Sequence, residues 1–220
     1  MQIESVAAKR SKTHTRYYLK DGTLCPGVTT VLGVLNKPAL VPWANKIGLA
    51  GIEVKNYVDV MALIGTTGHA MICAHNKGEK FDPDGLPADL IDKAENCFLS
   101  YLNWEKGHKV EPILCEAPLV SEHYGFGGTV DMYALVDGIP TIVDYKTGKA
   151  IYPEHIYQVA AYKTLIVENL LAGDALPQAV RILQIGRDET EGFSEKVVAD
   201  TTREWQIFEH CLAIYRLQKK

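Results

Sequence analysis

Two aspartates in the second half of the chain stand in a pattern that could bind a divalent cation. Asp131 and Asp144 flank an Asp137-Gly138 pair, and each acid lies six positions from it. Asp-Gly between two apolar, β-branched runs favours a tight hairpin, which would place the two acids almost opposite each other on neighbouring strands. Two carboxylates so close repel each other unless a cation lies between them.

Lys146 adds an ammonium group to this pair. Asp144 and Lys146 are two positions apart on the predicted strand, so their side chains leave on one face, while Val143 and Tyr145 point to the other. Two acids and a lysine suit phosphodiester hydrolysis: the acids hold a divalent ion that activates water, and the lysine orients water or stabilises developing charge. A bare Asp-x-Lys is far more often a cross-strand ion pair, so the surrounding motifs decide between the two interpretations.

Further motifs accompany these residues in a fixed order. Asp131 ends a Gly-Thr-Val-Asp run, Asp144-Tyr-Lys follows an apolar strand, Gln158-Val-Ala-Ala-Tyr162 lies on the next predicted helix, and Gly65-x-x-x-His69 precedes them all. Together they resemble the RecB-like branch of the PD-(D/E)xK nucleases, which includes phage, bacterial and mitochondrial exonucleases. The resemblance implies a restriction-endonuclease-like core and metal-dependent hydrolysis of DNA.

The resemblance also implies a role for each matching residue. The implied ligands of Mg²⁺ or Mn²⁺ are His69, Asp131, Asp144 and the backbone carbonyl of Tyr145. The implied catalytic residues are Lys146, Asp144, Asp131 and Glu116, the last as an outer metal or water ligand. We expect DNA contacts from Gln158, Tyr162, Lys149, Lys9, Arg10 and Arg16. Each has an ordinary alternative: a capping or core histidine, a helix pair, or a solvated surface charge.

The charge balance limits how the chain could contact nucleic acid. There are 23 Lys and Arg against 27 Asp and Glu, a net charge of −4, which argues against a broad DNA-coating surface. Five basic residues nevertheless lie in the first twenty, against the single acid Glu4. This segment is either a solvated terminus or a strip that steers a DNA strand towards the metal site.

Cysteine usage and hydropathy restrict the cofactors and the location. The five cysteines are far apart and form no Cys-x-x-Cys pair, so we expect no iron–sulfur cluster and no zinc finger. We see no apolar stretch approaching the roughly 18–20 residues of a membrane span and no signal peptide, which predicts no membrane partner and a cytoplasmic protein of a bacterial or phage-infected cell. We also see no helicase segment, so unwinding of duplex DNA would need a partner protein; self-association stays open.

Periodicity predicts an α/β fold: a mixed central sheet, made of an antiparallel meander plus added strands, flanked by helices. We expect one nuclease domain over 1–220, with a mainly helical part over 1–110 and the sheet core and C-terminal helices over 111–220. Predicted helices cover 28–35, 43–49, 54–76, 90–102, 154–171 and 202–217, with a break at 65–69 that puts His69 in the first turns of a restarted helix. Predicted strands cover 113–120, 128–136, 139–145, 179–185 and 193–198.

Three functions fit these observations. The first is a Mg²⁺- or Mn²⁺-dependent DNA nuclease, acting as an exonuclease on single-stranded DNA or DNA ends, with a structure-specific endonuclease as a variant. The second is a catalytically inactive nucleic-acid-binding or scaffold domain of the same fold. The third is a phosphohydrolase of small molecules, for which Gly65-Thr-Thr-Gly68 lacks the phosphate-loop lysine and Gly125-x-Gly-Gly128 precedes a strand rather than a helix.

Overall fold

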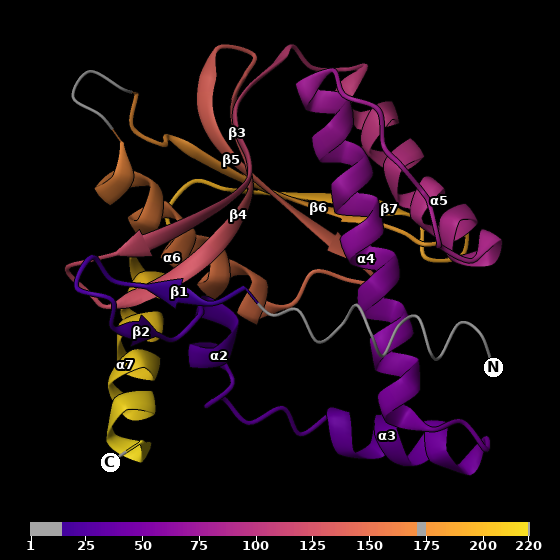
Figure 1. Ribbon diagram of the computed structural model, residues 1–220, viewed down its shortest axis with the longest axis horizontal. Coiled ribbons are helices and arrows are strands. Elements are labelled where there is room, and N and C mark those ends of the chain that lie inside the picture. Colours follow the sequence, from indigo (N-terminus) through magenta and orange to yellow (C-terminus); the bar gives the residue numbers. More distant parts are fainter. Residues whose placement is uncertain (1–14, 171–174, 220) are drawn as a thin grey trace.

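A five-stranded mixed sheet forms the centre of the computed structural model, which describes residues 15–170 and 175–219 (Figure 1). The strand order is β3-β4-β5-β6-β7. The strands are β3 (Val110–Ser121), β4 (Phe126–Val136), β5 (Ile139–Thr147), β6 (Ala179–Ile185) and β7 (Phe193–Val198). β3, β4 and β5 form the expected antiparallel meander, β6 joins β5 in parallel, and β7 is antiparallel to β6. The mixed sheet predicted from the sequence is confirmed.

The Asp137-Gly138 pair forms the predicted turn between β4 and β5. Both residues have positive φ, 52° and 80°, which matches the right-handed twist of a two-residue hairpin. The pairing runs from Val136 with Ile139 to Met132 with Val143. The next positions along this register are Asp131 and Asp144, so the turn brings the two acids to neighbouring places on adjacent strands.

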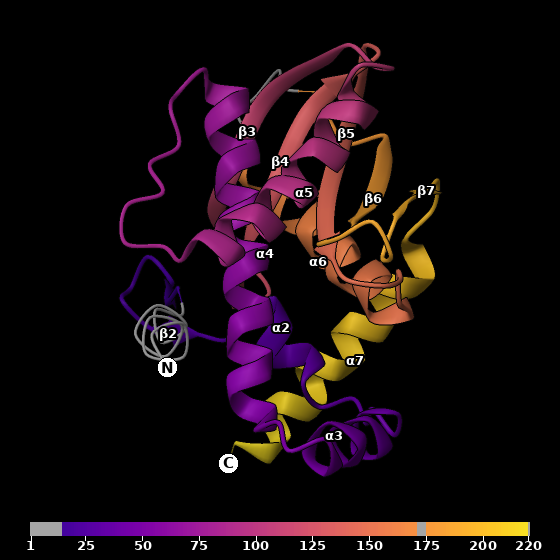
Figure 2. The ribbon, with the colours of Figure 1, turned by 90° about the vertical axis from the view of Figure 1, so that its right-hand side faces the viewer.

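Helices cover both faces of the sheet, as Figures 1 and 2 show. On one face, α4 (Val54–Lys77) and α5 (Ala88–Glu105) pack over apolar residues of β4, β5 and β6. On the other face, α2 (Val28–Leu32), α6 (Pro153–Asn169) and α7 (Thr202–Gln218) enclose a second apolar cluster. The parallel connection from β5 to β6 runs through α6, which is how parallel neighbours are usually joined. The predicted helical first half and flanking helices are therefore confirmed.

The predicted break in the helix at residues 65–69 is wrong, because α4 runs through both glycines without interruption. A Cβ on Gly65 would lie 2.7 Å from the Thr147 hydroxyl, and one on Gly68 would lie 3.1 Å from the Cβ of Cys97. The two glycines thus let α4 approach β5 and α5 closely. His69 consequently lies in the middle of a long helix that is held tightly against the sheet, and not in a first turn.

Two details of the first half also differ from the expectation. α2 ends at Leu32, before Gly33, so it is shorter than predicted. A small two-stranded sheet, β1 (Tyr17–Tyr18) with β2 (Leu24–Cys25), precedes it and was not predicted. These strands are too short for an alternation pattern to reveal them. The helix α3 (Leu40–Leu49) buries none of its residues, so it lies on the outside of the fold.

One of the described helices, α4, is long and apolar enough by length and composition to cross a membrane, which the sequence analysis did not anticipate. Its buried residues lie against α5 and the sheet, including Ile64, Met71 and Ile72. His69 and Asn76 are polar and make contacts inside this packing. α4 is therefore placed as the core helix of this fold.

Candidate active site

His69 lies over two acids of the sheet and forms a compact cluster with them. Its Nδ1 atom is 3.4 Å from Oε1 of Glu116 and 3.5 Å from Oδ1 of Asp131. One potential ligand atom from each of the three residues lies within 4.8 Å of the other two. Imidazole nitrogen and carboxylate oxygen are donors that first-row divalent cations accept, and carboxylate oxygen suits Mg²⁺ and Mn²⁺.

Glu116 reaches this cluster through an unusual backbone conformation. It lies between the pairs Cys115–Met132 and Ala117–Val130, so it faces Asp131 across the two strands. Its φ is 48°, in the left-handed region that non-glycine residues rarely adopt inside a strand. Such backbone strain gathers at functional sites, where the surrounding structure maintains it. The motif resemblance implies only an outer ligand at Glu116, whereas in the structure Glu116 lies as close to His69 as Asp131 does.

Asp131 is tied to β5 beside Asp144. Its Oδ2 atom accepts a hydrogen bond of 2.8 Å from the backbone N–H of Tyr145, in place of a ladder partner. The pKa of Asp131 is lowered: burial alone would raise it, but the positive charges of His69 and Lys146 and this hydrogen bond outweigh burial. Asp131 is therefore an anion in the folded protein.

Asp144 and Lys146 form an ion pair next to this cluster. The amine Nζ lies 2.6 Å from Oδ2, with Asp144 only 1% exposed and Lys146 17% exposed. Burial and the negative charge of Asp131 raise the pKa of Asp144 to about 7, although Lys146 opposes the shift. A carboxyl group that titrates near neutrality is suited to exchanging a proton with water at working pH.

The pKa of His69 moves in the opposite sense to that of an isolated buried histidine. Burial would lower this pKa, but the charge and hydrogen bond of Asp131, joined by Glu116, raise it to about 10. The ring is then protonated in the metal-free protein. Its lone pair becomes available to a cation only when that proton leaves, so metal binding and protonation compete at Nδ1.

Two acids of the site have buried oxygens whose hydrogen-bonding capacity is largely unused. Oδ1 of Asp144 has no hydrogen-bond donor among the described residues. Oδ2 of Asp144 has only the amine of Lys146 beside it, at 2.6 Å, and Oε1 of Glu116 has only Nδ1 of His69, at 3.4 Å. A buried carboxylate oxygen without a donor is costly, and natural proteins keep few of them. These oxygens, together with Asp131 and His69, are ligands that a hard divalent cation accepts, so the residues present fit Mg²⁺ or Mn²⁺.

The other predicted site residues divide into near and distant groups. Gln158 Nε2 donates a 2.6 Å hydrogen bond to Tyr162 Oη, so the predicted pair on one helical face exists. Burial and the charges of Asp131 and Asp144 raise the pKa of Tyr162 well above its usual value, which places a neutral phenol near the acids. Lys149 is exposed in the connection from β5 to α6.

The structure describes only part of the basic N-terminal strip of residues 1–20. Arg16 is exposed just before β1, whereas Lys9 and Arg10 lie outside the described residues. The ligand role of the Tyr145 carbonyl stays a prediction. The ring of Tyr145 packs edge-on against His69 at a centroid distance of 5.4 Å.

Comparison with known proteins gives similarity to solved structures only; no family model and no curated protein sequence matches the chain. An alkaline exonuclease from Laribacter hongkongensis, LHK-Exo, is 12% identical with a TM-score of 0.42, over 72% of this chain and 84% of that one. Its complex with dAMP gives a TM-score of 0.41 at the same identity and coverage. A provisionally assigned exonuclease from Eubacterium rectale is 14% identical with a TM-score of 0.43, over 72% of this chain and 65% of that one. These likenesses concern overall arrangement, and the candidate active site is defined by this chain's own residues.

Proposed function

We propose that the chain is a metal-dependent nuclease that hydrolyses phosphodiester bonds of DNA, acting as an exonuclease on single strands or on DNA ends. The observation that carries the proposal is the convergence of His69, Glu116 and Asp131 on one metal-sized position beside the Asp144–Lys146 pair. The motif resemblance supports DNA as the substrate. The proposal takes residues 1–220 as one nuclease domain working in the cytoplasm.

A divalent cation would be held by His69, Glu116 and Asp131, with Asp144 as the adjoining acid. When bound, it would supply Lewis acidity to a phosphoryl oxygen and lower the pKa of water, the two contributions that phosphate hydrolysis needs most. The acids of the cluster would also lose their mutual repulsion. Mg²⁺ or Mn²⁺ is proposed because most donors are carboxylate oxygens, which these cations prefer.

The chain's own residues would do the rest of the chemistry. Lys146 Nζ, oriented by Asp144, would donate hydrogen bonds to the attacking water or to a phosphate oxygen and oppose the charge that develops there. Asp144, with a pKa of about 7, would accept the water's proton at a carboxylate oxygen. Tyr162, fixed by Gln158, would keep the neighbouring wall of the site neutral and in place.

The test is cleavage of DNA by purified protein with Mn²⁺, using linear and circular substrates in single- and double-stranded form. Lys146→Ala should abolish cleavage and leave DNA binding in EDTA intact. Lys196→Ala, which removes an exposed lysine of β7, is the matched control and should cleave as wild type does. Cleavage of linear but not circular DNA identifies an exonuclease, and cleavage of both identifies an endonuclease. Wild-type protein that binds DNA without cleaving it refutes the proposal and identifies a binding domain.

A further inference from the structure

A cavity of about 440 Å³ lies between α3 and the first turn of α6. Aromatic rings of Trp43, Tyr152 and His155 line it, with Lys37 and Glu154 also contributing. The volume falls in the lower range of ligand pockets, enough for one nucleotide. None of these residues belongs to the metal cluster.

The cavity adjoins the candidate active site. The connection from β5 to α6 leads from Lys146 to Tyr152, so one short stretch of chain borders both. Burial and the positive charges of Lys146 and Lys37 lower the pKa of His155 to about 3. The ring of His155 is therefore neutral and lies within electrostatic reach of both lysines, one from each site.

The cavity walls are held in place and offer both stacking surface and positive charge. Trp43 packs against Tyr57 of α4 at a centroid distance of 6.0 Å. Tyr152 is 54% exposed, and its ring meets His155 edge-on at 5.5 Å. The backbone N–H of Tyr152 also donates to His155 Nδ1 at 3.2 Å. Lys37 lies 4.0 Å from Glu154 and keeps 44% exposure, so its amine can reach a phosphate.

We propose that this cavity binds one unpaired nucleotide of the substrate strand, with the base stacked on Trp43 and Tyr152 and a phosphate held by Lys37. Base–aromatic stacking tolerates any sequence and requires a base that is not paired in a duplex. The cavity would thus favour single strands and feed the strand towards Lys146. This inference rests on the proposed function and specifies the substrate of the same site.

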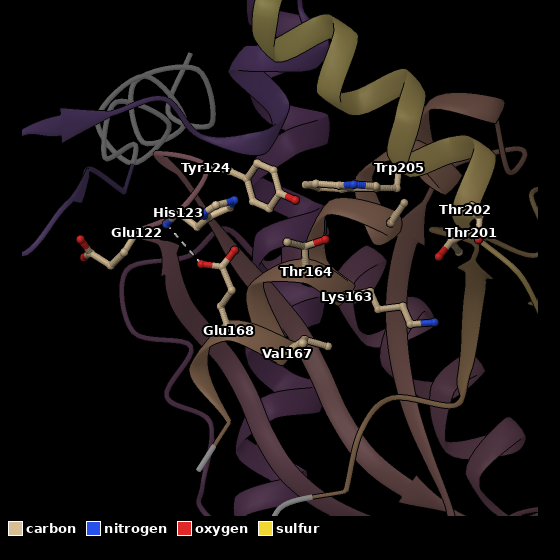
Figure 3. Close-up of a pocket in the computed structure, with 11 residues that line it drawn as sticks. Glu122, His123, Tyr124, Lys163, Thr164, Val167, Glu168, Thr201, Thr202 and Trp205 are labelled. Atoms are coloured by element: carbon tan, nitrogen blue, oxygen red, sulfur yellow. Dashed lines mark hydrogen bonds between the residues drawn. The ribbon is translucent and has the colours of Figure 1, made fainter. Parts of the chain in front are cut away.

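The larger cavity over α6 and α7, about 610 Å³, is less suited to the same ligand (Figure 3). It also has two aromatic rings, Tyr124 and Trp205, packed at 4.9 Å. However, Glu122 and Glu168 line it, and Glu168 is already engaged by Ser121 and by the backbone N–H of His123. Among the described lining residues, Lys163 is the one lysine against these two carboxylates, so the lining of the larger cavity has an excess of negative charge, whereas Lys37 and Glu154 balance in the α3–α6 cavity. A phosphate is therefore better accommodated in the α3–α6 cavity.

The first experiment measures binding without cleavage. Anisotropy titrations in EDTA use fluorescein-labelled oligothymidylate and an abasic strand of the same length. Wild-type protein should bind the abasic strand about tenfold more weakly, the loss of roughly one base–aromatic stack. Trp43→Ala and Tyr152→Ala should bind oligothymidylate about tenfold more weakly and should discriminate less between the two strands. Equal affinity of wild-type protein for both strands would overturn the inference without reference to any variant.

Two further variants separate stacking from folding. Trp43→Phe keeps an aromatic ring and should bind oligothymidylate within about twofold of wild type. Tyr18→Ala, which removes an exposed tyrosine of β1, should do the same. Trp43→Ala binding as tightly as Trp43→Phe would contradict the stacking role. Because these titrations involve no cleavage, their failure is distinguishable from failure of the proposed nuclease activity, which the Mn²⁺ assay reports separately.

Discussion

Two clusters of charge lie near the ends of neighbouring strands and differ in how their polar atoms are satisfied. In the turn after β6, the backbone N–H and Nε of Arg187 donate to Oε2 of Glu191 at 3.0 and 2.9 Å. In the candidate active site, Oδ1 of the buried Asp144 has no donor among the described residues, and Oε1 of Glu116 has only Nδ1 of His69 nearby, at 3.4 Å. The first cluster is complete by itself, whereas the second has coordination capacity left for a ligand.

The pKa values of Glu191 and Asp144 also differ between the two clusters. The pKa of Glu191 is lowered, because hydrogen bonds from Arg187 favour its anion despite partial burial. The pKa of Asp144 is raised to about 7, because burial and the neighbouring acid disfavour its anion. The pKa of Glu191, which is paired within the fold, and the pKa of Asp144, which we propose takes part in the chemistry, are thus shifted in opposite directions.

The largest effect is expected from Asp144→Asn. The amide cannot accept the proton of water, and without a negative charge it attracts a cation only weakly, so cleavage should fall by about 10³-fold. In EDTA above pH 7, however, the free energy of unfolding should rise, because a neutral group replaces a buried anion. Initial rates with Mn²⁺ and urea unfolding in EDTA measure the two effects. A variant that retained a tenth or more of the wild-type rate would show that Asp144 has no chemical role.

Glu191→Gln should show the opposite combination. Removal of the acid leaves Arg187 with a weaker partner in a largely buried place, and the free energy of unfolding should fall by about 3 kcal/mol. Cleavage below the melting temperature should stay at the wild-type rate. Because the folded pKa of Glu191 lies below its ordinary 4.5, the wild-type advantage should be full above that pH and fade as pH falls through the folded pKa. Unfolding curves across acid pH test this; an unchanged midpoint would mean that the two clusters do not differ in stabilising effect.

Binding of Mn²⁺ should stabilise the folded protein through the active-site cluster and not through the Arg187–Glu191 pair. At a concentration of about 100 times Kd, the cation should raise the free energy of unfolding by about 2.7 kcal/mol. His69→Gln and Glu116→Gln should lose most of this gain, and Glu191→Gln should keep it. The gain should also grow with rising pH, because His69 must release a proton to coordinate. Melting curves with and without Mn²⁺ give the comparison, and equal shifts in all variants would place the cation elsewhere.

The smallest predicted effect is the pH dependence of the unfolding free energy that protonation of His69 causes in the metal-free protein. The folded pKa of His69, about 10, lies above its ordinary value of 6.5, so its stabilisation is full below 6.5 and is lost as pH rises through 10. The difference in unfolding free energy between wild type and His69→Gln should therefore shrink over this window by at least about 1 kcal/mol. Urea unfolding in EDTA at several alkaline pH values measures it. A constant difference would mean that His69 is neutral beside its two acids.

Much of the fold was predictable because the order of apolar, polar and turn residues along a segment indicates whether that segment forms a helix, a strand or a turn. The runs of apolar and β-branched residues in β4 and β5 and the Asp137-Gly138 turn predict the hairpin, and its register follows from counting residues. The break at 65–69 failed because glycine lowers helix propensity, while here it permits the close approach of α4 to Thr147. Propensity describes an isolated segment, and only the packed neighbour shows why a small residue is required.

Residue types and spacing were enough to group Asp131, Asp144 and Lys146, since two strands and a short turn leave them little freedom. The position of Glu116 in the ligand cluster and the 54% exposed Tyr152 beside Trp43 depended on the tertiary structure. Glu116 has its left-handed backbone at a position where β3 lies against β4, and the cavity lies where α3 meets α6. Pattern along a chain records neighbours in sequence, whereas contacts between distant segments form only when the whole core is packed.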